Sequence, residues 1–286
     1  MTAPPLASSS ALATRQGKLV LALLCAVGFL DFLDASIVNV ALPSIARDLH
    51  FSVQNLQWVL SGYVVTYGGF LMLGGRFADL LGRRRTLVAG TVLFGLASLT
   101  GGLAPNAGTL VGARLVQGLG AALMSPAALS IVLATFGEGP ERNQALGYWS
   151  ITATGGAAVG LLLGGVLTSY AGWRWNFFIN VPVGAVMSVV IARVVPAYAP
   201  GEARTRLDVP GAVLATAGLM AAVFYLSQSP AWGWLDVRTL PALVAALILL
   251  AVFVAHEQRA PYPLVPLAIF RNRNLSGANL AMAAVF

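Results

Sequence analysis

The protein contains the sequence Gly75-Arg76-Phe77-Ala78-Asp79-Leu80-Leu81-Gly82-Arg83-Arg84-Arg85 between two long apolar runs, at 55–74 and 86–104. This link combines one acid, two glycines and a cluster of arginines, and it is too short to form a domain. A short, charged link between two apolar runs is typical of consecutive membrane-spanning helices. The link therefore predicts a polytopic membrane protein, and its arginines help to set the direction in which the chain crosses the bilayer.

The composition of the 286 residues agrees with a lipid environment. Hydrophobic residues make up 58% of the chain and charged residues only 9%, whereas a soluble domain carries about 25% charged residues. The formal net charge of +7 does not indicate nucleic-acid binding, because the arginines lie in short links between apolar runs. The single cysteine, Cys25, excludes an internal disulfide bond and a cysteine-based metal site.

Eight apolar runs approach the roughly 20 residues that a membrane-spanning helix needs. They lie at 19–42, 55–74, 86–104, 109–134, 144–168, 175–195, 209–229 and 239–255. The first run follows two basic residues, as in a signal peptide, but its length and the many later spans favour a retained helix. A ninth run begins near Asn274 and stops at Phe286. Because a half-span leaves backbone groups unsatisfied in lipid, we expect either a piece of a longer protein or a truncated product.

These runs predict an all-α membrane protein with six consecutive parts. The parts are a cytoplasmic N-terminus (1–18), an N-terminal six-helix bundle (19–195), a cytoplasmic linker (196–208), an extra helix pair (209–255), a second cytoplasmic link (256–273) and the start of a second bundle (274–286).

The lysines and arginines predict the orientation of the chain. With the N-terminus in the cytoplasm, 13 of the 17 basic residues lie in inner links, and Arg114 lies inside a helix. The outer links hold only Arg47, Arg174 and Arg238. The inner residues are Arg15, Lys18, Arg76, Arg83, Arg84, Arg85, Arg142, Arg193, Arg204, Arg206, Arg259, Arg271 and Arg273. Because cationic links favour the cytoplasmic side, we expect a multi-pass protein of the plasma or inner cell membrane with its N-terminus in the cytoplasm.

Three ionisable residues lie at membrane depth. Asp31 and Asp34 are three positions apart in the first run and share roughly one helix face, and Arg114 lies in the fourth run. A charge at the bilayer centre costs about 2.5–3.5 kcal/mol on insertion scales, so such groups face a cavity or a partner. One interpretation is a relay for protons or cations, and the other is a static ion pair that only fixes helix packing.

The fifth run contains a ridge of glycines. Gly156, Gly160 and Gly164 are spaced by four residues, and Gly155 and Gly165 lie beside them. A ridge without side chains lets a neighbouring helix approach closely. Tight static packing is one interpretation, and a surface on which two helices rock against each other is the other.

Signals of a soluble active site are missing from the sequence. His50 and His256 lie in opposite links without ligand partners at metal spacing. No catalytic triad, phosphate-binding or dinucleotide-binding pattern stands in a suitable context. We therefore expect no enzyme activity, no metal or other cofactor, and neither a nucleic-acid nor a protein partner.

Five segments form an ordered set of motifs over about residues 30–182. They are Leu33-Asp34-Ala35-Ser36-Ile37-Val38-Asn39-Val40-Ala41-Leu42-Pro43, the link from Gly75 to Arg84, Arg114-Leu115-Val116-Gln117-Gly118-Leu119-Gly120-Ala121-Ala122, Gly156 to Gly160 with Gly164-Gly165, and Trp173-Arg174-Trp175 with Asn180-Val181-Pro182. Together they resemble the motifs of the major facilitator superfamily, and more narrowly its 14-helix branch of drug:proton antiporters. The expected helix pair after the sixth helix also fits that branch.

The resemblance implies a proton-coupled multidrug efflux transporter. Two six-helix bundles would expose a central site alternately to each side and export drug-like amphiphilic or cationic compounds, with protons and the lipid bilayer as further partners. Asp34 and Arg114, with Asp31 nearby, would carry the proton coupling. The remaining motif positions are a cytoplasmic gate of Gly75, Asp79, Gly82, Arg83 and Arg84, a helix 4 motif of Arg114, Gln117 and Gly118, and a helix 5 motif of Gly156, Gly160, Gly164 and Gly165.

The chain departs from the family pattern at two positions. Leu161 stands where the helix 5 motif usually has proline, and Leu80 replaces a common basic residue of the link. The first departure weakens the interpretation of the fifth helix as a hinge. Two alternatives therefore stay open, namely a transporter of one metabolite such as a sugar or an amino acid, and a product that no longer transports.

Overall fold

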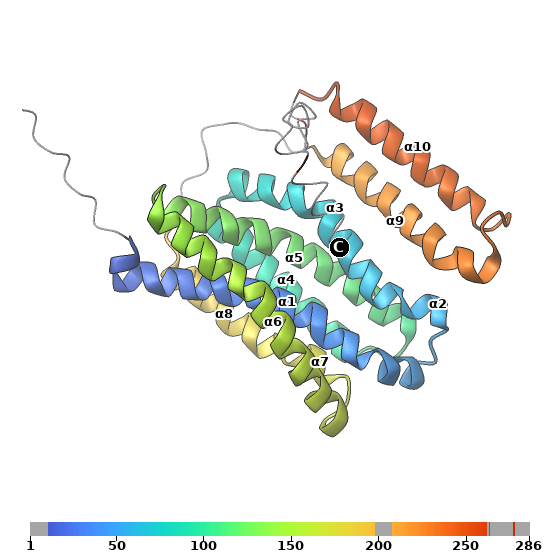
Figure 1. Ribbon diagram of the computed structural model, residues 1–286, viewed down its shortest axis with the longest axis horizontal. Helices are drawn as coiled ribbons and strands as arrows, with labels where there is room; N and C mark the ends of the chain where they lie inside the picture. The colour runs from blue at the N-terminus through green and yellow to red at the C-terminus, as the bar shows by residue number, and fades with distance from the viewer. Residues whose placement is uncertain (1–10, 198–207, 262, 264–276, 278–286) are drawn as a thin grey trace, which may run out of the picture. The chain divides into compact units, whose positions relative to one another are not determined.

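The computed structural model describes residues 11–197, 208–261, 263 and 277, and these residues form helices joined by short links (Figure 1). The chain divides into two compact units, Met1–Arg204 and Thr205–Phe286. Several sequence-based expectations fall outside the described residues: most of the linker at 196–208, the later part of the link at 256–273, most of the expected second-bundle start at 274–286, and Arg204, Arg206, Arg271 and Arg273.

All eight predicted apolar runs form helices. The first unit contains η1 (Ala11–Ala13), α1 (Arg15–Asp48), α2 (Val53–Leu56), α3 (Trp58–Leu81), α4 (Arg83–Gly102), α5 (Ala107–Thr135), α6 (Pro140–Tyr170), α7 (Trp175–Phe178) and α8 (Asn180–Val194), and the second contains α9 (Val209–Trp232) and α10 (Leu240–Glu257). Most long helices extend beyond the apolar runs, because helical hydrogen bonding continues through polar terminal residues. The hydroxyl of Thr14 caps α1, for example, and accepts from the backbone N–H of Gly17.

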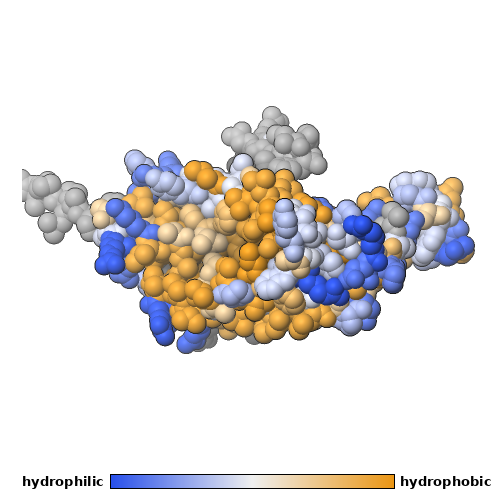
Figure 2. Space-filling model, turned by 90° about the horizontal axis from the view of Figure 1, so that it is seen from below, coloured by the Kyte–Doolittle hydropathy of each residue, from blue (hydrophilic) through white to orange (hydrophobic). Residues whose placement is uncertain are grey.

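Seven of the described helices are long and apolar enough to cross a membrane. The run at 86–104 is the exception, because the 20 residues of α4 begin with Arg83, Arg84 and Arg85 and include several glycines and threonines. This helix packs against α3, α5, α7 and α8, and it therefore needs less apolar surface of its own. Hydrophobic residues cover a broad area of the face shown in Figure 2, as expected for a protein that has lipid as its solvent.

Links that the basic residues assign to the cytoplasm come together at one end of the first unit. The backbone N–H of Leu12 donates to Glu141 Oε1 at 2.8 Å, which joins the beginnings of α1 and α6. Arg84 Nη1 donates to the carbonyl of Val195 at 3.3 Å, which joins the beginning of α4 to the end of α8.

The opposite end of the first unit is held by Asp48. Its Oδ2 accepts from Trp173 Nε1 at 2.9 Å and from Arg174 Nη1 at 2.5 Å. Arg174 Nη2 also donates to the carbonyl of Ala104 at 3.4 Å. The end of α1, the end of α4 and the link after α6 therefore meet there, and consecutive links alternate between two ends as in an up-and-down bundle.

Candidate functional site

Polar side chains from α1, α5 and α8 meet at Asp34 inside the first unit. Asp34 accepts from Arg114 Nη1 at 2.6 Å, from Gln117 Nε2 at 2.8 Å and from Asn180 Nδ2 at 2.6 Å. All four side chains are at most 1% exposed. Three donors from two helices therefore surround one carboxylate that water does not reach.

Arg114 is held on several sides. Its Nε donates to the carbonyl of Val59 at 2.9 Å, and its Nη1 donates to Gln117 Oε1 at 2.7 Å. Its guanidinium carbon lies 4.3 Å from the centre of the Tyr63 ring, within the range of a cation–π interaction. The charge of Arg114 is therefore balanced by one carboxylate and by groups from α3 and α5.

Local sequence explains why these groups meet. Arg114 and Gln117 are three residues apart on α5 and share one face. The next residue, Gly118, has no side chain, and a Cβ there would collide with the backbone of Tyr63. The glycine thus lets α3 approach α5 closely enough for Val59 and Tyr63 to reach Arg114.

Asp31 belongs to the same cluster through Tyr63. The Tyr63 hydroxyl donates to Asp31 Oδ1, and the Asp31 side chain is only 5% exposed. The structure therefore brings the three predicted membrane-depth charges together, with Asp34 paired to Arg114 and Asp31 bonded to the tyrosine that lies against the same guanidinium.

Two members of this cluster lie outside the predicted site residues, and a third has no predicted role. Tyr63 supplies a ring and a hydroxyl, and Ser98 of α4 accepts from Gln117 Nε2 at 2.8 Å. Asn180 belongs to one of the motifs, but its role is visible only in the structure: its amide donates to Asp34, and its Oδ1 is buried with no hydrogen-bond partner in the described part of the chain. The signal that the sequence offers for each of these three residues is a polar side chain within a mostly apolar run.

The cluster has a definite chemical capacity. A proton added to Asp34 neutralises the carboxylate and removes the main electrostatic attraction on Arg114. A proton lost from it restores the ion pair. Protonation and the position of the arginine are therefore linked, provided that the interior opens to water in another state.

The predicted gate residues lie around the turn between α3 and α4. Gly82 has φ +94°, a left-handed conformation that favours glycine, and it permits the sharp change of direction there. Asp79 is exposed on the last turn of α3, and Arg83 begins α4. Gly75 lies in α3, where a Cβ would meet Pro126 at 3.9 Å. The predicted latch between Asp79 and the arginines stays a prediction.

The glycine ridge of α6 faces α1. Cβ atoms on Gly156, Gly160 and Gly164 would stand 2.6–2.9 Å from backbone oxygens of α1, which is closer than real Cβ contacts. A Cβ on Gly165 would have no neighbour within 4 Å, so this residue lies off the ridge. The two helices are therefore in close backbone contact, and rocking along this contact stays a prediction.

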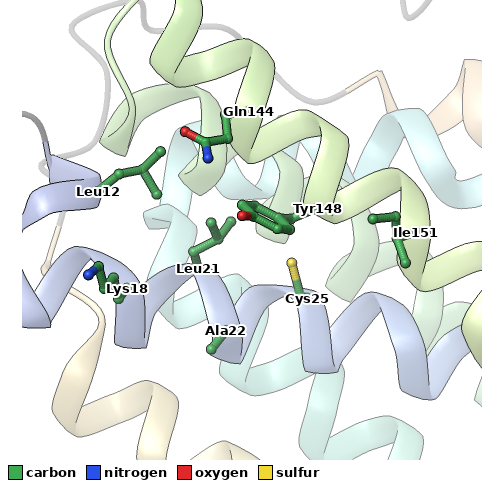
Figure 3. Close-up of a pocket in the computed structure, with 8 residues that line it drawn as sticks. All are labelled: Leu12, Lys18, Leu21, Ala22, Cys25, Gln144, Tyr148 and Ile151. Atoms are coloured by element: carbon green, nitrogen blue, oxygen red, sulfur yellow. The ribbon is translucent and has the colours of Figure 1, made fainter.

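A pocket of about 500 Å³ opens between η1, α1 and α6. In Figure 3, Tyr148 of α6 lies over Leu21 and Cys25 of α1. The pocket is lined by Leu12, Lys18, Leu21, Ala22, Cys25, Gln144, Tyr148 and Ile151. Its size falls in the range of small-molecule sites, and mostly apolar walls with one ammonium, one amide and one hydroxyl suit an amphiphile.

None of the predicted site residues lines this pocket. The only available signal was helical spacing, because Lys18, Ala22 and Cys25 recur on one face of α1 at intervals of four and three. Gln144, Tyr148 and Ile151 recur in the same way on α6. The sequence does not say that these two faces meet.

A family profile described as Major Facilitator Superfamily matches residues 24–286. The puromycin resistance protein pur8 of Streptomyces alboniger is 42% identical over 262 residues, which cover 92% of this chain and 52% of that protein. The cephamycin export protein CmcT of Amycolatopsis lactamdurans is 41% identical over 272 residues, which cover 94% of this chain and 56% of that protein. The chain thus spans about half the length of these relatives.

The fold is also similar to solved transporter structures. The inward-facing, occupied crystal structure of a bacterial homologue of the human lysosomal transporter Spinster has a TM-score of 0.58 at 19% identity. The match covers 88% of this chain and 64% of that one. At this identity the likeness concerns the fold alone.

Proposed function

The chain belongs to the Major Facilitator Superfamily, and from this premise we propose that it forms part of a multi-pass exporter that moves antibiotic-like amphiphilic compounds out of the cell in exchange for protons. The observation that carries the proposal is the similarity to two relatives named for antibiotic resistance and export, each over more than nine-tenths of this chain. Alternating access between two bundles is the mechanism that we infer, with residues 19–195 in the first bundle.

The buried cluster supports the proton-coupled part of the proposal. Asp34 takes up a proton when the interior opens to one side, and Arg114 moves away from the neutral carboxyl. Re-forming the pair expels the proton to the other side. Tyr63 donates to Asp31, and the Arg114 guanidinium lies over the ring of Tyr63. A movement of Arg114 therefore also affects this second carboxyl group.

The pocket between α1 and α6 supports the amphiphilic part of the proposal. Tyr148 and the apolar residues bind the hydrophobic body of a substrate, and Gln144 offers a polar group to its head. Cys25 lines this pocket and is the single cysteine of the chain, so its modification reports on occupancy.

Export is tested in a bacterial strain without its own drug exporters. Expression of the whole gene that contains the coding sequence of these residues is expected to lower the accumulation of puromycin, a cephamycin and the fluorescent cation ethidium, and a protonophore is expected to abolish the effect. Unchanged accumulation of all drugs, together with proton-dependent uptake of a sugar or an amino acid, would show that the substrate class is wrong. Drug export that resists the protonophore would refute proton coupling alone.

Substrate binding near Cys25 is tested by protection from alkylation. A transported amphiphile is expected to slow modification of Cys25 by a maleimide in membranes, and Tyr148→Ala is expected to remove the protection. Val190→Ala, on an exposed part of α8, serves as the control and is expected to keep it. If saturating substrate leaves the alkylation rate unchanged, the pocket is not part of the binding site.

A further inference from the structure

Two acids and a histidine meet at one end of the second unit, where α9 begins and α10 ends. Asp208 caps α9, and its Oδ1 accepts from the backbone N–H of Gly211 at 2.9 Å. His256 Nε2 lies 2.7 Å from the same oxygen. α9 and α10 lie side by side (Figure 1), so this contact ties the start of one helix to the end of the other.

The second acid, Glu257, lies at the other oxygen of Asp208. Its side chain is 4% exposed, and Asp208 is 8% exposed. A Cβ built on Gly211 would have both Glu257 Oε1 and Asp208 Oδ2 within 2.9 Å. The glycine therefore makes room for two carboxyl groups over the first turn of α9.

Asp208 Oδ2 is buried and has no hydrogen-bond donor among the described residues. A buried carboxylate oxygen without a donor is costly, and two neighbouring carboxylates in one site disfavour double ionisation. A single proton between Asp208 and Glu257 removes both penalties, because it turns one acid into a donor to the other.

We propose that Asp208, Glu257 and His256 form a proton-binding site at this end of the helix pair, in which the two carboxyl groups hold one proton between them. The site is separate from the Asp34 cluster and goes beyond the proposed export function. The shared proton bonds the beginning of α9 to the end of α10, and its loss leaves two adjacent negative charges that push these ends apart.

The surroundings indicate which acid carries the proton. Burial raises the pKa of Asp208, but the N–H of Gly211, the His256 imidazole and the Glu257 side chain outweigh it and hold that pKa below its ordinary value. Asp208 is therefore the stronger acid of the two and accepts the shared proton as a hydrogen bond. The next charged residue along the described chain is Arg259, which is exposed just after the end of α10.

Among the described residues, few titratable groups lie at this end of the helix pair. α9 contributes Asp208, and α10 contributes His256 and Glu257. Within the described residues, no group of histidine, cysteine, aspartate or glutamate side chains is arranged to hold a metal ion.

Infrared difference spectroscopy of the full chain in lipid nanodiscs tests the proposal, because a protonated carboxyl group has its own C=O stretching band. Glu257→Gln is expected to remove the intensity of one protonated carboxyl at neutral pH, since the Gln amide then donates to an ionised Asp208. Asp236→Asn, which changes the acid in the link between α9 and α10, is the matched control and is expected to leave the band unchanged.

His256→Gln keeps both acids and provides a second readout. Because the variant removes a group that carries positive charge when protonated, the shared proton is expected to persist to higher pH than in the unmodified chain. A neutral-pH spectrum that is the same in Glu257→Gln and in the unmodified chain would overturn the proposal. A protonated-carboxyl band whose pH midpoint does not move in His256→Gln would also overturn it.

Discussion

At the residue scale, Arg114 is the largest fully buried side chain of the described part of the chain. Its pairing with Asp34 is weak evidence for net stability, because burying both charges has a large desolvation cost. Removing only one partner is a different matter, since the remaining charge is then buried alone. The ion pair therefore tolerates joint replacement better than single replacement.

Arg114→Ala is expected to destabilise the first unit by about 3–5 kcal/mol, because it leaves the Asp34 charge uncompensated. Thermal unfolding of the purified chain in detergent measures the effect. Replacing both residues, as Asp34→Leu with Arg114→Met, is expected to recover much of the loss. Arg238→Gln is the control, because Arg238 is 66% exposed and its ion pair contributes little. Equal melting temperatures for Arg114→Ala and Arg238→Gln would contradict the expectation.

Asp34→Asn separates coupling from folding. The amide keeps the shape of the side chain but cannot carry the negative charge, so we expect insertion to persist and uphill export to be lost. Export is followed with a fluorescent substrate in proteoliposomes that have a pH gradient and contain the product of the whole gene. Proton-driven export equal to that of the unmodified protein would leave Asp34 and Arg114 as a structural pair only.

At the scale of elements, the contact between α1 and α6 depends on glycine. A Cβ on Gly160 would stand 2.7 Å from the carbonyl oxygen of Leu33. The Cβ is attached directly to the backbone of α6, and the oxygen is part of the backbone of α1. Backbone cannot move aside as a flexible side chain does. Even a single methyl group therefore forces the two helices apart.

Gly160→Ala is expected to cost about 1–3 kcal/mol through overpacking. Gly165→Ala lies on the same helix with open space around its Cβ position, and it is expected to be neutral or to stabilise by up to about 1 kcal/mol through helix propensity. Melting temperatures of the two variants in detergent make the comparison. If Gly165→Ala lowers the melting temperature as much as Gly160→Ala, close packing of the ridge is not the cause.

At the scale of the whole molecule, the distribution of basic residues predicts the orientation. Thirteen of the 17 lie in links assigned to the cytoplasm, and in the first unit such links meet at one end. The test uses intact cells that express a Cys25→Ser variant with one new cysteine. A cysteine placed within residues 196–208 is expected to resist a membrane-impermeant thiol reagent, and Pro105→Cys is expected to react with it. The reverse pattern would invert the topology.

The share of the relatives that this chain covers leads to a further prediction. Residues 1–286 span about half of pur8 and CmcT, and alternating access needs two bundles that move against each other. We expect these residues alone to insert into liposomes but not to accumulate a fluorescent cation along a pH gradient. Accumulation well above that of empty liposomes would mean that the chain pairs with itself or that two bundles are not required.

Much of the architecture could be predicted from the sequence, because the signals are local. A run of about 20 apolar residues is helical in lipid whatever its neighbours are, since the helix satisfies the backbone polar groups within the segment itself. The eight runs, their approximate bounds and the motif residues Asp34 and Arg114 were therefore accessible. The described helix ends differ by several residues, because hydropathy marks the apolar part of a helix and not its caps.

The partners of these residues were decided only by the tertiary structure. Asp34 meets Asn180 and Arg114 meets Tyr63 across distances of many residues, and the rotation of each helix about its axis determines which face turns inward. Hydropathy carries little information on that rotation when a helix is apolar all round. The sequence by itself thus determined the membrane class, the helices and the charge pattern. Packing between distant segments decided the buried cluster at Asp34, the pocket at Cys25 and the contact of Asp208 with His256 between α9 and α10.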